Sequence, residues 1–269
     1  MIESIGVVAG VPRSGTSWLG MLIDSSPAVN YRFQPFFAYA FKDSVTADSS
    51  PQEFAALMRR MDGHTDEFLA QADKRSAGLY PTFTKHNPTT TLALKMCRYQ
   101  YLIPTMLEHL PQLRLVGIVR HPCGVLHSWS RNPKEFPPGS DLAREWRFGA
   151  CKNQGREENF FGFHKWREVA HLYLDLAVKY PDRVRVISYE ALVAETEKLT
   201  HELFEFLDLE VSAQTEEFVR ACHASHSDSP YAVFKDPSVA THWRRELDPA
   251  IQRAVVREVQ GTPLERFLA

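Results

Sequence analysis

The 269-residue sequence has little of several features that mark common classes of protein. Its four cysteines include no C-x-x-C pair, which argues against a disulfide scaffold or a cysteine zinc site and favours a reducing compartment. No hydrophobic run approaches the length of a transmembrane helix, so we expect no stable membrane insertion. The net charge is only −2, which argues against bulk nucleic-acid binding. Any anion-binding site must therefore be local.

The chain also lacks a charged-then-apolar leader, because an apolar run already occupies residues 5–9. We therefore expect either a cytoplasmic protein or one whose N-terminal anchor has been removed. With 44% hydrophobic and 24% charged residues, the composition is sufficient for a substantial core. The length fits one domain spanning residues 1–269, and no pattern indicates an oligomeric state.

The stretch at residues 7–19 is the most informative part of the chain. Residues 5–9 predict a buried parallel strand, residues 10–15 a turn and residues 16–25 a helix. A strand, a turn and a helix N-terminus in this order form an anion site, because backbone N–H groups converge there and the helix dipole adds partial positive charge. The structural alternative is a tight strand–helix turn without a ligand.

Side chains in this turn supply further donors. Arg13 adds a fixed cation, and hydroxyl groups come from Ser14, Thr16 and Ser17. The pattern differs from the nucleotide loop G-x-x-x-x-G-K-[ST], since Gly15 is followed by Thr16 rather than by a lysine. We therefore expect the turn to hold a phosphate or sulfate group.

Residues 12–19 read P-R-S-G-T-S-W-L. This pattern resembles the 5′-phosphosulfate loop of the sulfotransferases that use 3′-phosphoadenosine 5′-phosphosulfate (PAPS). The resemblance implies an α/β fold, a three-layer sandwich with a central parallel sheet related to the P-loop NTPases. It also implies that PAPS and its product adenosine 3′,5′-bisphosphate (PAP) bind to this loop without a metal. The implied cofactor contacts are Arg13, Ser14, Gly15, Thr16, Ser17 and Trp18.

A second motif follows the clearest predicted strand, which ends at Arg120. Residues 120–129 resemble the family's 3′-phosphate motif, V-R-[DN]-P-x-x-x-x-x-S, which implies that Arg120 and Ser128 bind the 3′-phosphate. His121 stands where the family has Asp or Asn. No Asp or Glu occurs at residues 109–134, which keeps the local field positive. The structural alternative is an ordinary strand–helix turn with an exposed arginine.

Two anion sites at the ends of neighbouring strands favour a nucleotide with two phosphate-bearing positions. ATP has no 3′-phosphate, so a P-loop kinase is the less favoured enzyme class, and the G-K-[ST] sequence that it needs for ATP and Mg²⁺ is absent. The non-enzymatic alternative is a degenerate sulfotransferase that binds the nucleotide without turnover, because the usual catalytic base is missing.

Catalysis needs cations on the sulfuryl group and a base for the acceptor. A short buried strand is predicted around Lys95, and the resemblance implies that Lys95 and Arg13 neutralise charge on the sulfuryl oxygens. The family's glutamate and histidine base positions hold Gln34 and Cys97. His86, on the polar loop before this strand, is our candidate base.

The residues that bind the acceptor are predicted from the composition of the segments rather than from a sequence motif. Residues 31–41 form an aromatic patch, from which Gln34 and Phe36 are the expected substrate contacts. We expect specificity to come from a helical insertion at about residues 44–80, between the first two predicted strands. A loop at about residues 132–162 is the expected lid or acceptor loop. The acceptor that we expect is a carbohydrate or glycan-like molecule, with a small alcohol as the alternative.

Two later segments complete the resemblance. Residues 189–192 are similar to the family's Y-E-D-L turn, which implies that Tyr189 packs near the adenine. Residues 243–247 are similar to W-[RK]-x-x-L, which implies that Arg244 closes over the 3′-phosphate, although the glycine-rich lead-in of the family is missing.

Overall fold

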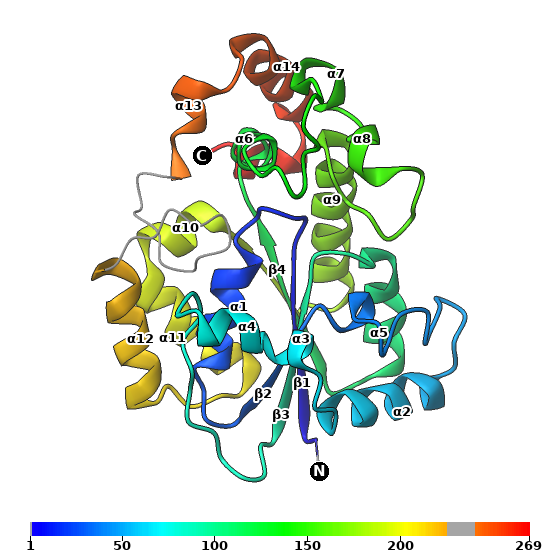
Figure 1. The fold of residues 1–269 in the computed structure, drawn as a ribbon, viewed down its shortest axis with the longest axis vertical. Coiled ribbons are helices and arrows are strands. Elements are labelled where there is room, and N and C mark those ends of the chain that lie inside the picture. Colours follow the sequence, from blue (N-terminus) through cyan, green and yellow to red (C-terminus); the bar gives the residue numbers. More distant parts are fainter. Residues whose placement is uncertain (1, 225–239) are drawn as a thin grey trace.

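A five-stranded parallel sheet forms the centre of the computed structural model, which describes residues 2–224 and 240–269. The strands are β1 (Ser4–Ala9), β2 (Val29–Phe33), β3 (Thr91–Met96), β4 (Leu113–Val119) and β5 (Val184–Ser188). Their order in the sheet is β2-β3-β1-β4-β5, and every neighbouring pair is parallel. Helices cover both faces of the sheet (Figure 1).

The two faces of the sheet carry separate hydrophobic cores, because successive side chains of a strand point to opposite sides. In β1, Ile5 and Val7 belong to one core and Val8 to the other. The first core packs against α2 (Pro51–Asp62), α5 (Ile103–His109) and α9 (Phe163–Lys179). The second packs against α1 (Thr16–Asp24), α11 (Thr196–Leu207) and α12 (Ala213–Ala224). The prediction of a three-layer α/β sandwich is confirmed.

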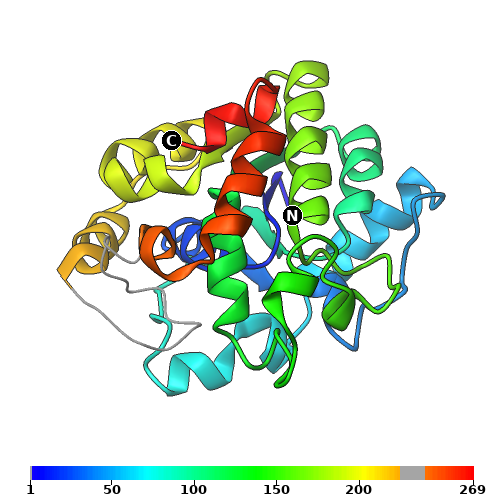
Figure 2. The same ribbon diagram turned by 90° about the horizontal axis from the view of Figure 1, so that it is seen from above.

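The described residues form further helices around these layers. They are η1 (Pro35–Phe37), α3 (Glu67–Ala70), α4 (Ala72–Ser76), η2 (Gln100–Leu102), α6 (Pro122–Ser130), α7 (Leu142–Glu145), α8 (Ala150–Asn153), α10 (Tyr189–Ala194), α13 (Trp243–Glu246), α14 (Pro249–Val259) and η4 (Pro263–Phe267). Figure 1 shows α6, α13 and α14 at the end of the molecule toward which the strands run, and Figure 2 shows α6 beside α14. In the described ranges, no helix combines the length and hydrophobicity needed to cross a bilayer.

Strand β2 was not predicted, because its residues 31–33 were assigned to the aromatic patch at residues 31–41. Its side chains alternate as in an edge strand: Val29, Tyr31 and Phe33 are buried, whereas Asn30 and Arg32 hydrogen-bond to carbonyl groups at the end of α2. The three helices α2, α3 and α4 therefore lie between the second and third strands, not between the first two strands as we expected.

The topology decides which loops meet. All five strands run in one direction, so the loops that follow them gather at one edge of the sheet. Strand β1 lies between β3 and β4, with Ala9 opposite Met96 on one side and Gly117 on the other. The segments after β1, β3 and β4 are thus brought together, and these segments carry the sequence motifs.

Candidate active site

The loop between β1 and α1 has the backbone geometry of an anion site. Arg13 and Gly15 adopt positive φ angles of 76° and 93°. A Cβ atom on Gly15 would lie 2.4 Å from Tyr189 Cδ2, so this position requires glycine. Helix α1 begins directly after Gly15 and has no side-chain cap. The N–H groups of its first turn therefore face the loop without a capping side chain, in the arrangement that binds anions.

Arg13 joins this loop to the second motif. Its Nε donates a hydrogen bond to Ser128 Oγ of α6 at 3.1 Å, and Arg120 Nη1 donates to the Arg13 carbonyl oxygen at 3.3 Å. Arg13 follows β1 and Arg120 follows β4, which are neighbouring strands. The two sequence motifs thus form one continuous site.

In the part of the chain that the structure describes, two polar atoms of this site are buried without a hydrogen-bond partner: Ser14 Oγ and Arg120 Nε. A buried polar group without a partner costs about 1–3 kcal/mol, and an anion with several acceptor oxygens supplies the missing bonds. The Arg120 guanidinium lies 4.5 Å from the centroid of the Tyr189 ring, and Trp18 meets the same ring edge-to-face at 6.2 Å. The residues present therefore fit a phosphate-bearing ligand with an aromatic base.

His121, which stands where the resembled motif has Asp or Asn, caps the helix that follows it. Its Nδ1 accepts the Cys123 N–H at 3.1 Å, so the imidazole caps α6. Burial, together with the charges of Arg244 and Arg120, lowers the pKa of His121 to about 3. The ring is therefore neutral near pH 7 and keeps the lone pair that the cap needs. It also stacks on Trp243 at 4.0 Å between centroids, which brings the segment of Arg244 beside the second motif.

Two lysines meet at one aromatic ring beyond the loop. Lys95 is buried at the end of β3, and its Nζ lies 4.2 Å from the centroid of Phe33. Lys74 Nζ, on α4, lies 4.6 Å from the same centroid. Burial and the neighbouring Lys95 charge lower the pKa of Lys74 to about 8. Sequence reasoning missed Lys74, because only the fold brings the insertion against β2 and β3.

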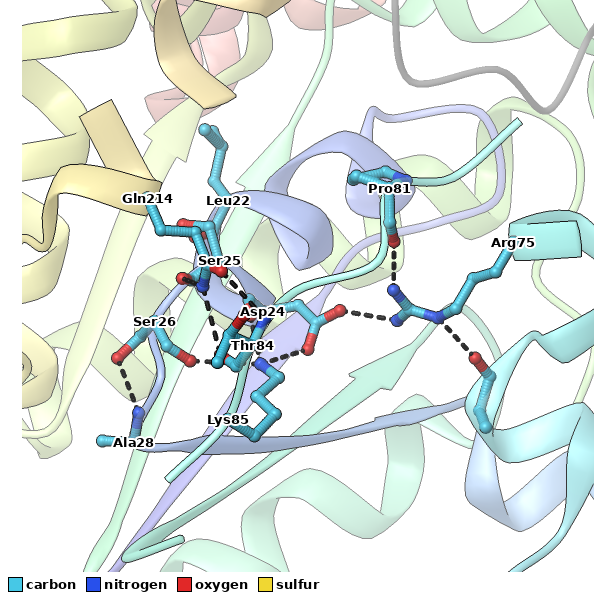
Figure 3. Close-up of polar contacts among 11 residues, drawn as sticks. Leu22, Asp24, Ser25, Ser26, Ala28, Arg75, Pro81, Thr84, Lys85 and Gln214 are labelled. Carbon is cyan, nitrogen blue, oxygen red and sulfur yellow. Dashed lines mark hydrogen bonds and ion pairs between the residues drawn. The ribbon is translucent and has the colours of Figure 1, made fainter. Parts of the chain in front are cut away.

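A buried ion-pair network holds α4 in this position (Figure 3). Asp24, at the end of α1, has a side chain that is only 2% exposed. It pairs with Arg75 Nη2 at 2.6 Å and with Lys85 Nζ at 2.8 Å. Arg75 directly follows Lys74, so the network ties the helix that carries Lys74 to the helix that follows the anion loop.

The expected substrate contacts lie in different environments. The Gln34 N–H donates to the Lys95 carbonyl oxygen at 2.9 Å, and Gln34 Oε1 is buried with no hydrogen-bond partner among the residues described. Gln34 therefore lies beside Lys95. Phe36 is only 3% exposed and packs against Tyr99 in the core, so its expected role as a substrate contact does not fit its position. The neighbouring Phe37 is 44% exposed, so its ring is accessible to a ligand.

His86 lies at the opposite edge of the sheet. Its N–H donates to the Pro27 carbonyl oxygen at 2.8 Å, just before β2 begins, and its side chain is exposed. The loop that precedes a parallel strand and the loop that follows it are separated by the strand itself, so β3 lies between His86 and the loops at its carboxyl end. His86 is therefore not a candidate base. Cys97, at the other base position of the family, has its Sγ 2.9 Å from Thr16 Oγ1.

A carboxylate that sequence reasoning missed lies against the anion loop. Glu135 follows α6, and its Oε2 is 3.8 Å from Arg13 Nη1. This oxygen is buried and has no hydrogen-bond partner within residues 2–224 and 240–269. A signal was present in the sequence, because Glu135 is the first carboxylate after the acid-free stretch at residues 109–134.

Comparisons with known proteins give one family and one fold. A family model described as the sulfotransferase family matches residues 7–213, a range that contains the anion loop, Lys95, Arg120 and Ser128. A search of curated protein sequences gave no match.

Several solved structures resemble the chain at low sequence identity, which shows the fold alone. The sulfotransferase domain of the Synechococcus PCC 7002 olefin synthase has a TM-score of 0.54 and 16% identity, with 95% of this chain and 93% of that chain covered. Mouse sulfotransferase SULT7A1 complexed with PAP has a TM-score of 0.54 and 16% identity, with 100% and 89% covered. Retinol dehydratase in complex with androsterone and the inactive cofactor PAP has a TM-score of 0.58 and 14% identity, with 98% and 83% covered.

Proposed function

The chain belongs to the sulfotransferase family, and on that premise we propose that it transfers a sulfuryl group from PAPS to a hydroxyl or amine acceptor. The observation that carries the choice of donor is a pair of buried atoms, Ser14 Oγ and Arg120 Nε, that have no hydrogen-bond partner among the residues that the structure describes. They lie on two loops that Arg13 connects. A ligand with anionic groups at two positions matches two such loops. The solved complexes of mouse SULT7A1 and retinol dehydratase, both with PAP, agree with this choice.

Each part of the site has a role in the proposed binding mode. The loop of Arg13 to Ser17, with the N-terminus of α1, would hold the 5′-phosphosulfate. Arg120 and Ser128 would hold the 3′-phosphate, with Arg244 beside them. Tyr189 and Trp18 would contact the adenine. Bound PAPS would supply an activated sulfuryl group on a good leaving group.

The chain's own contribution to the reaction is positioning and charge. Sulfuryl transfer should resemble phosphoryl transfer, in which the reacting atoms lie in line and developing charge is stabilised. Arg13 and Lys95 would neutralise charge on the sulfuryl oxygens. Lys74, whose Nζ lies over the same Phe33 ring as Lys95 Nζ, would add a second amine beside Lys95.

The acceptor that we propose is a small molecule with a hydroxyl group. Phe33, Phe37 and Phe68 form an aromatic wall next to Lys95, with Phe68 packed against both other rings. Such rings can stack on a sugar face or hold an apolar alcohol. Our expectation of a carbohydrate acceptor stays a prediction, and a panel of monosaccharides and aliphatic alcohols with radiolabelled PAPS tests it.

Thermal stabilisation by PAP, compared with ADP and ATP–Mg²⁺, tests the donor. PAP at a hundred times its dissociation constant should stabilise the fold by about 2.7 kcal/mol. Arg13→Ala and Arg120→Ala should each weaken PAP binding about 10- to 100-fold, the scale of a charged hydrogen bond. Arg144→Ala, at an exposed arginine that pairs with Asp141 at the start of the same short helix, is the matched control and should bind PAP like the wild type.

The other outcomes discriminate between the alternatives. Stabilisation by ATP–Mg²⁺ but not by PAP would replace the proposal with a kinase. Binding of PAP without turnover on any acceptor or water would favour the degenerate sulfotransferase. An absence of response to all three ligands would overturn the proposed donor.

A further inference from the structure

The reaction proposed above needs a base, and the chain lacks one at both positions where its family has one. Gln34 cannot accept a proton, and the Cys97 thiol already lies within hydrogen-bond distance of Thr16. His86 lies at the opposite edge of the sheet. The base must therefore come from an element that the sequence motifs do not include.

We propose that Glu135 is the general base of this site. The proposal rests on the proposed sulfuryl transfer and on three structural observations: the contact of Glu135 with the anion loop, the buried oxygen without a hydrogen-bond partner, and the rigid backbone that holds the residue.

The contact with the anion loop places the carboxylate beside the expected reaction centre. Glu135 Oε2 lies 3.8 Å from Arg13 Nη1, and Arg13 is the residue expected to face the sulfuryl group. At this distance the guanidinium faces the carboxylate without a hydrogen bond that would occupy its lone pair. The next residue back, Lys134, is close enough to Lys74 for its charge to act on that amine. The loop of Glu135 therefore lies near both the anion loop and the two lysines, Lys74 and Lys95, that contact the Phe33 ring.

The buried oxygen is available for a proton. Glu135 Oε2 is shielded from solvent and has no hydrogen-bond partner among the described residues. Other carboxylates near the second motif are already committed: Glu190 accepts the His121 N–H at 3.1 Å, and Glu246 bonds the His127 ring at 3.0 Å. Glu135 thus combines proximity to the loop with an unused acceptor atom.

The backbone of Glu135 is fixed on both sides, which a base needs for a defined geometry. Its N–H donates to the Asn132 carbonyl oxygen at 2.9 Å, and its own carbonyl oxygen accepts the Trp129 indole N–H at 2.9 Å. The following Phe136 packs edge-to-face on the Trp129 ring at 4.9 Å. This turn ties Glu135 to α6, the helix that also carries Ser128.

The proposed step balances in atoms and charge. The acceptor oxygen forms a bond to sulfur, and the bond between sulfur and the bridging oxygen of the donor breaks, with its electron pair leaving on PAP. The acceptor proton moves to Glu135 Oε2, and Glu135 returns it to water when the products leave.

Glu135→Gln tests the role, because the amide keeps the shape and cannot accept the proton. Two reactions with PAPS are compared: hydrolysis, in which water is the acceptor, and transfer to p-nitrophenol, which is largely ionised at mildly alkaline pH and needs no base. We expect hydrolysis to fall at least 100-fold, the scale of general-base loss, and p-nitrophenol sulfation to fall less than threefold. Glu135→Asp, which restores a carboxylate, should recover part of the hydrolysis. Glu157→Gln, at an exposed glutamate in the segment after α8, is the control.

Each other outcome has a defined meaning. A Glu135→Gln variant that hydrolyses PAPS at the wild-type rate overturns the proposal. A variant with a raised KM for PAPS and an unchanged kcat shows that Glu135 only holds Arg13, which also overturns it. Thermal stabilisation by PAP is measured first on the wild type, so that failure to bind PAP counts against the sulfotransferase proposal, whereas failure of the Glu135 role appears only in a protein that binds PAP.

Discussion

Gly15→Ala is the substitution whose effect the structure determines most sharply. Two separate costs apply at this position. The residue has a φ angle of 93°, which costs an alanine about 1–3 kcal/mol. The added Cβ would also lie 2.4 Å from Tyr189 Cδ2 and 2.8 Å from Cε2, an overpacked contact that typically costs about 1–3 kcal/mol. The free energy of unfolding should therefore fall by about 2–6 kcal/mol.

Gly139→Ala separates the two costs. Gly139 has a similar φ angle of 85°, but a Cβ there would meet no atom within 4 Å. It carries the backbone cost alone, so the difference between the two variants measures the contact with Tyr189. We expect urea denaturation followed by circular dichroism to give a loss that is about 1–3 kcal/mol larger for Gly15→Ala.

Ligand binding provides a second readout of the same contact. The Tyr189 ring must move to admit the methyl group, and this ring lies under the Arg120 guanidinium. PAP should therefore stabilise Gly15→Ala less than Gly139→Ala. In a Tyr189→Ala background the extra loss caused by Gly15→Ala should disappear, because the two positions are in contact. Equal losses for the two glycine variants in the wild-type background would refute the reasoning.

Two further predictions concern titratable groups. The pKa of Lys74 is lowered from 10.5 to about 8, so the folded state releases this proton before the unfolded state does, and stability should rise between pH 8 and 10.5. Lys74→Met should remove that rise and stabilise the fold by about 1 kcal/mol at pH 7, a value reduced for the partial exposure of the amine. A series of urea denaturations at different pH values checks both effects. If the free energy of unfolding of the variant rises with pH as in the wild type, the lowered pKa of Lys74 is contradicted. His121→Ala should cost about 1 kcal/mol through the lost cap of α6, whereas His121→Asn should restore most of it, and equal stability of the two variants would show that the cap contributes nothing.

The positions of the two motif loops could be predicted from the sequence because their signals are local. Glycine, hydroxyl groups and an arginine follow directly after an apolar run, and one rule of parallel sheets then brings Lys95 and Arg120 to the same edge. The same rule excludes His86, since a loop before a strand lies at the other edge. The prediction of His86 as the base was wrong because His86 precedes β3, whereas the motif loops follow their strands.

The remaining parts depend on contacts between distant segments. The contact of Gly15 with Tyr189 joins the first loop to the segment after β5, and the loop sequence alone does not show which ring lies there. Strand β2 is difficult to recognise in the sequence because aromatic residues occupy two of its buried positions and continue into the aromatic segment that follows. The contact of Arg32 with the end of α2, which marks its outward-facing side, appears only in the tertiary structure. Lys74 lies on the helical insertion and Glu135 on the loop after α6. Only the tertiary structure shows that these two segments lie beside the candidate site.

Arg13 would link the proposed donor binding to the proposed base. It donates to Ser128, accepts a hydrogen bond from Arg120 through its carbonyl oxygen, and faces Glu135. A carboxylate close to an anionic donor would be repelled by about 4 kcal/mol at 4 Å in a medium of effective dielectric constant 20. A guanidinium beside the carboxylate offsets that repulsion, so a base of negative charge can lie close to a donor of negative charge. Replacement of Arg13 should therefore reduce PAPS binding and acceptor deprotonation together, whereas replacement of Arg120 should reduce binding alone.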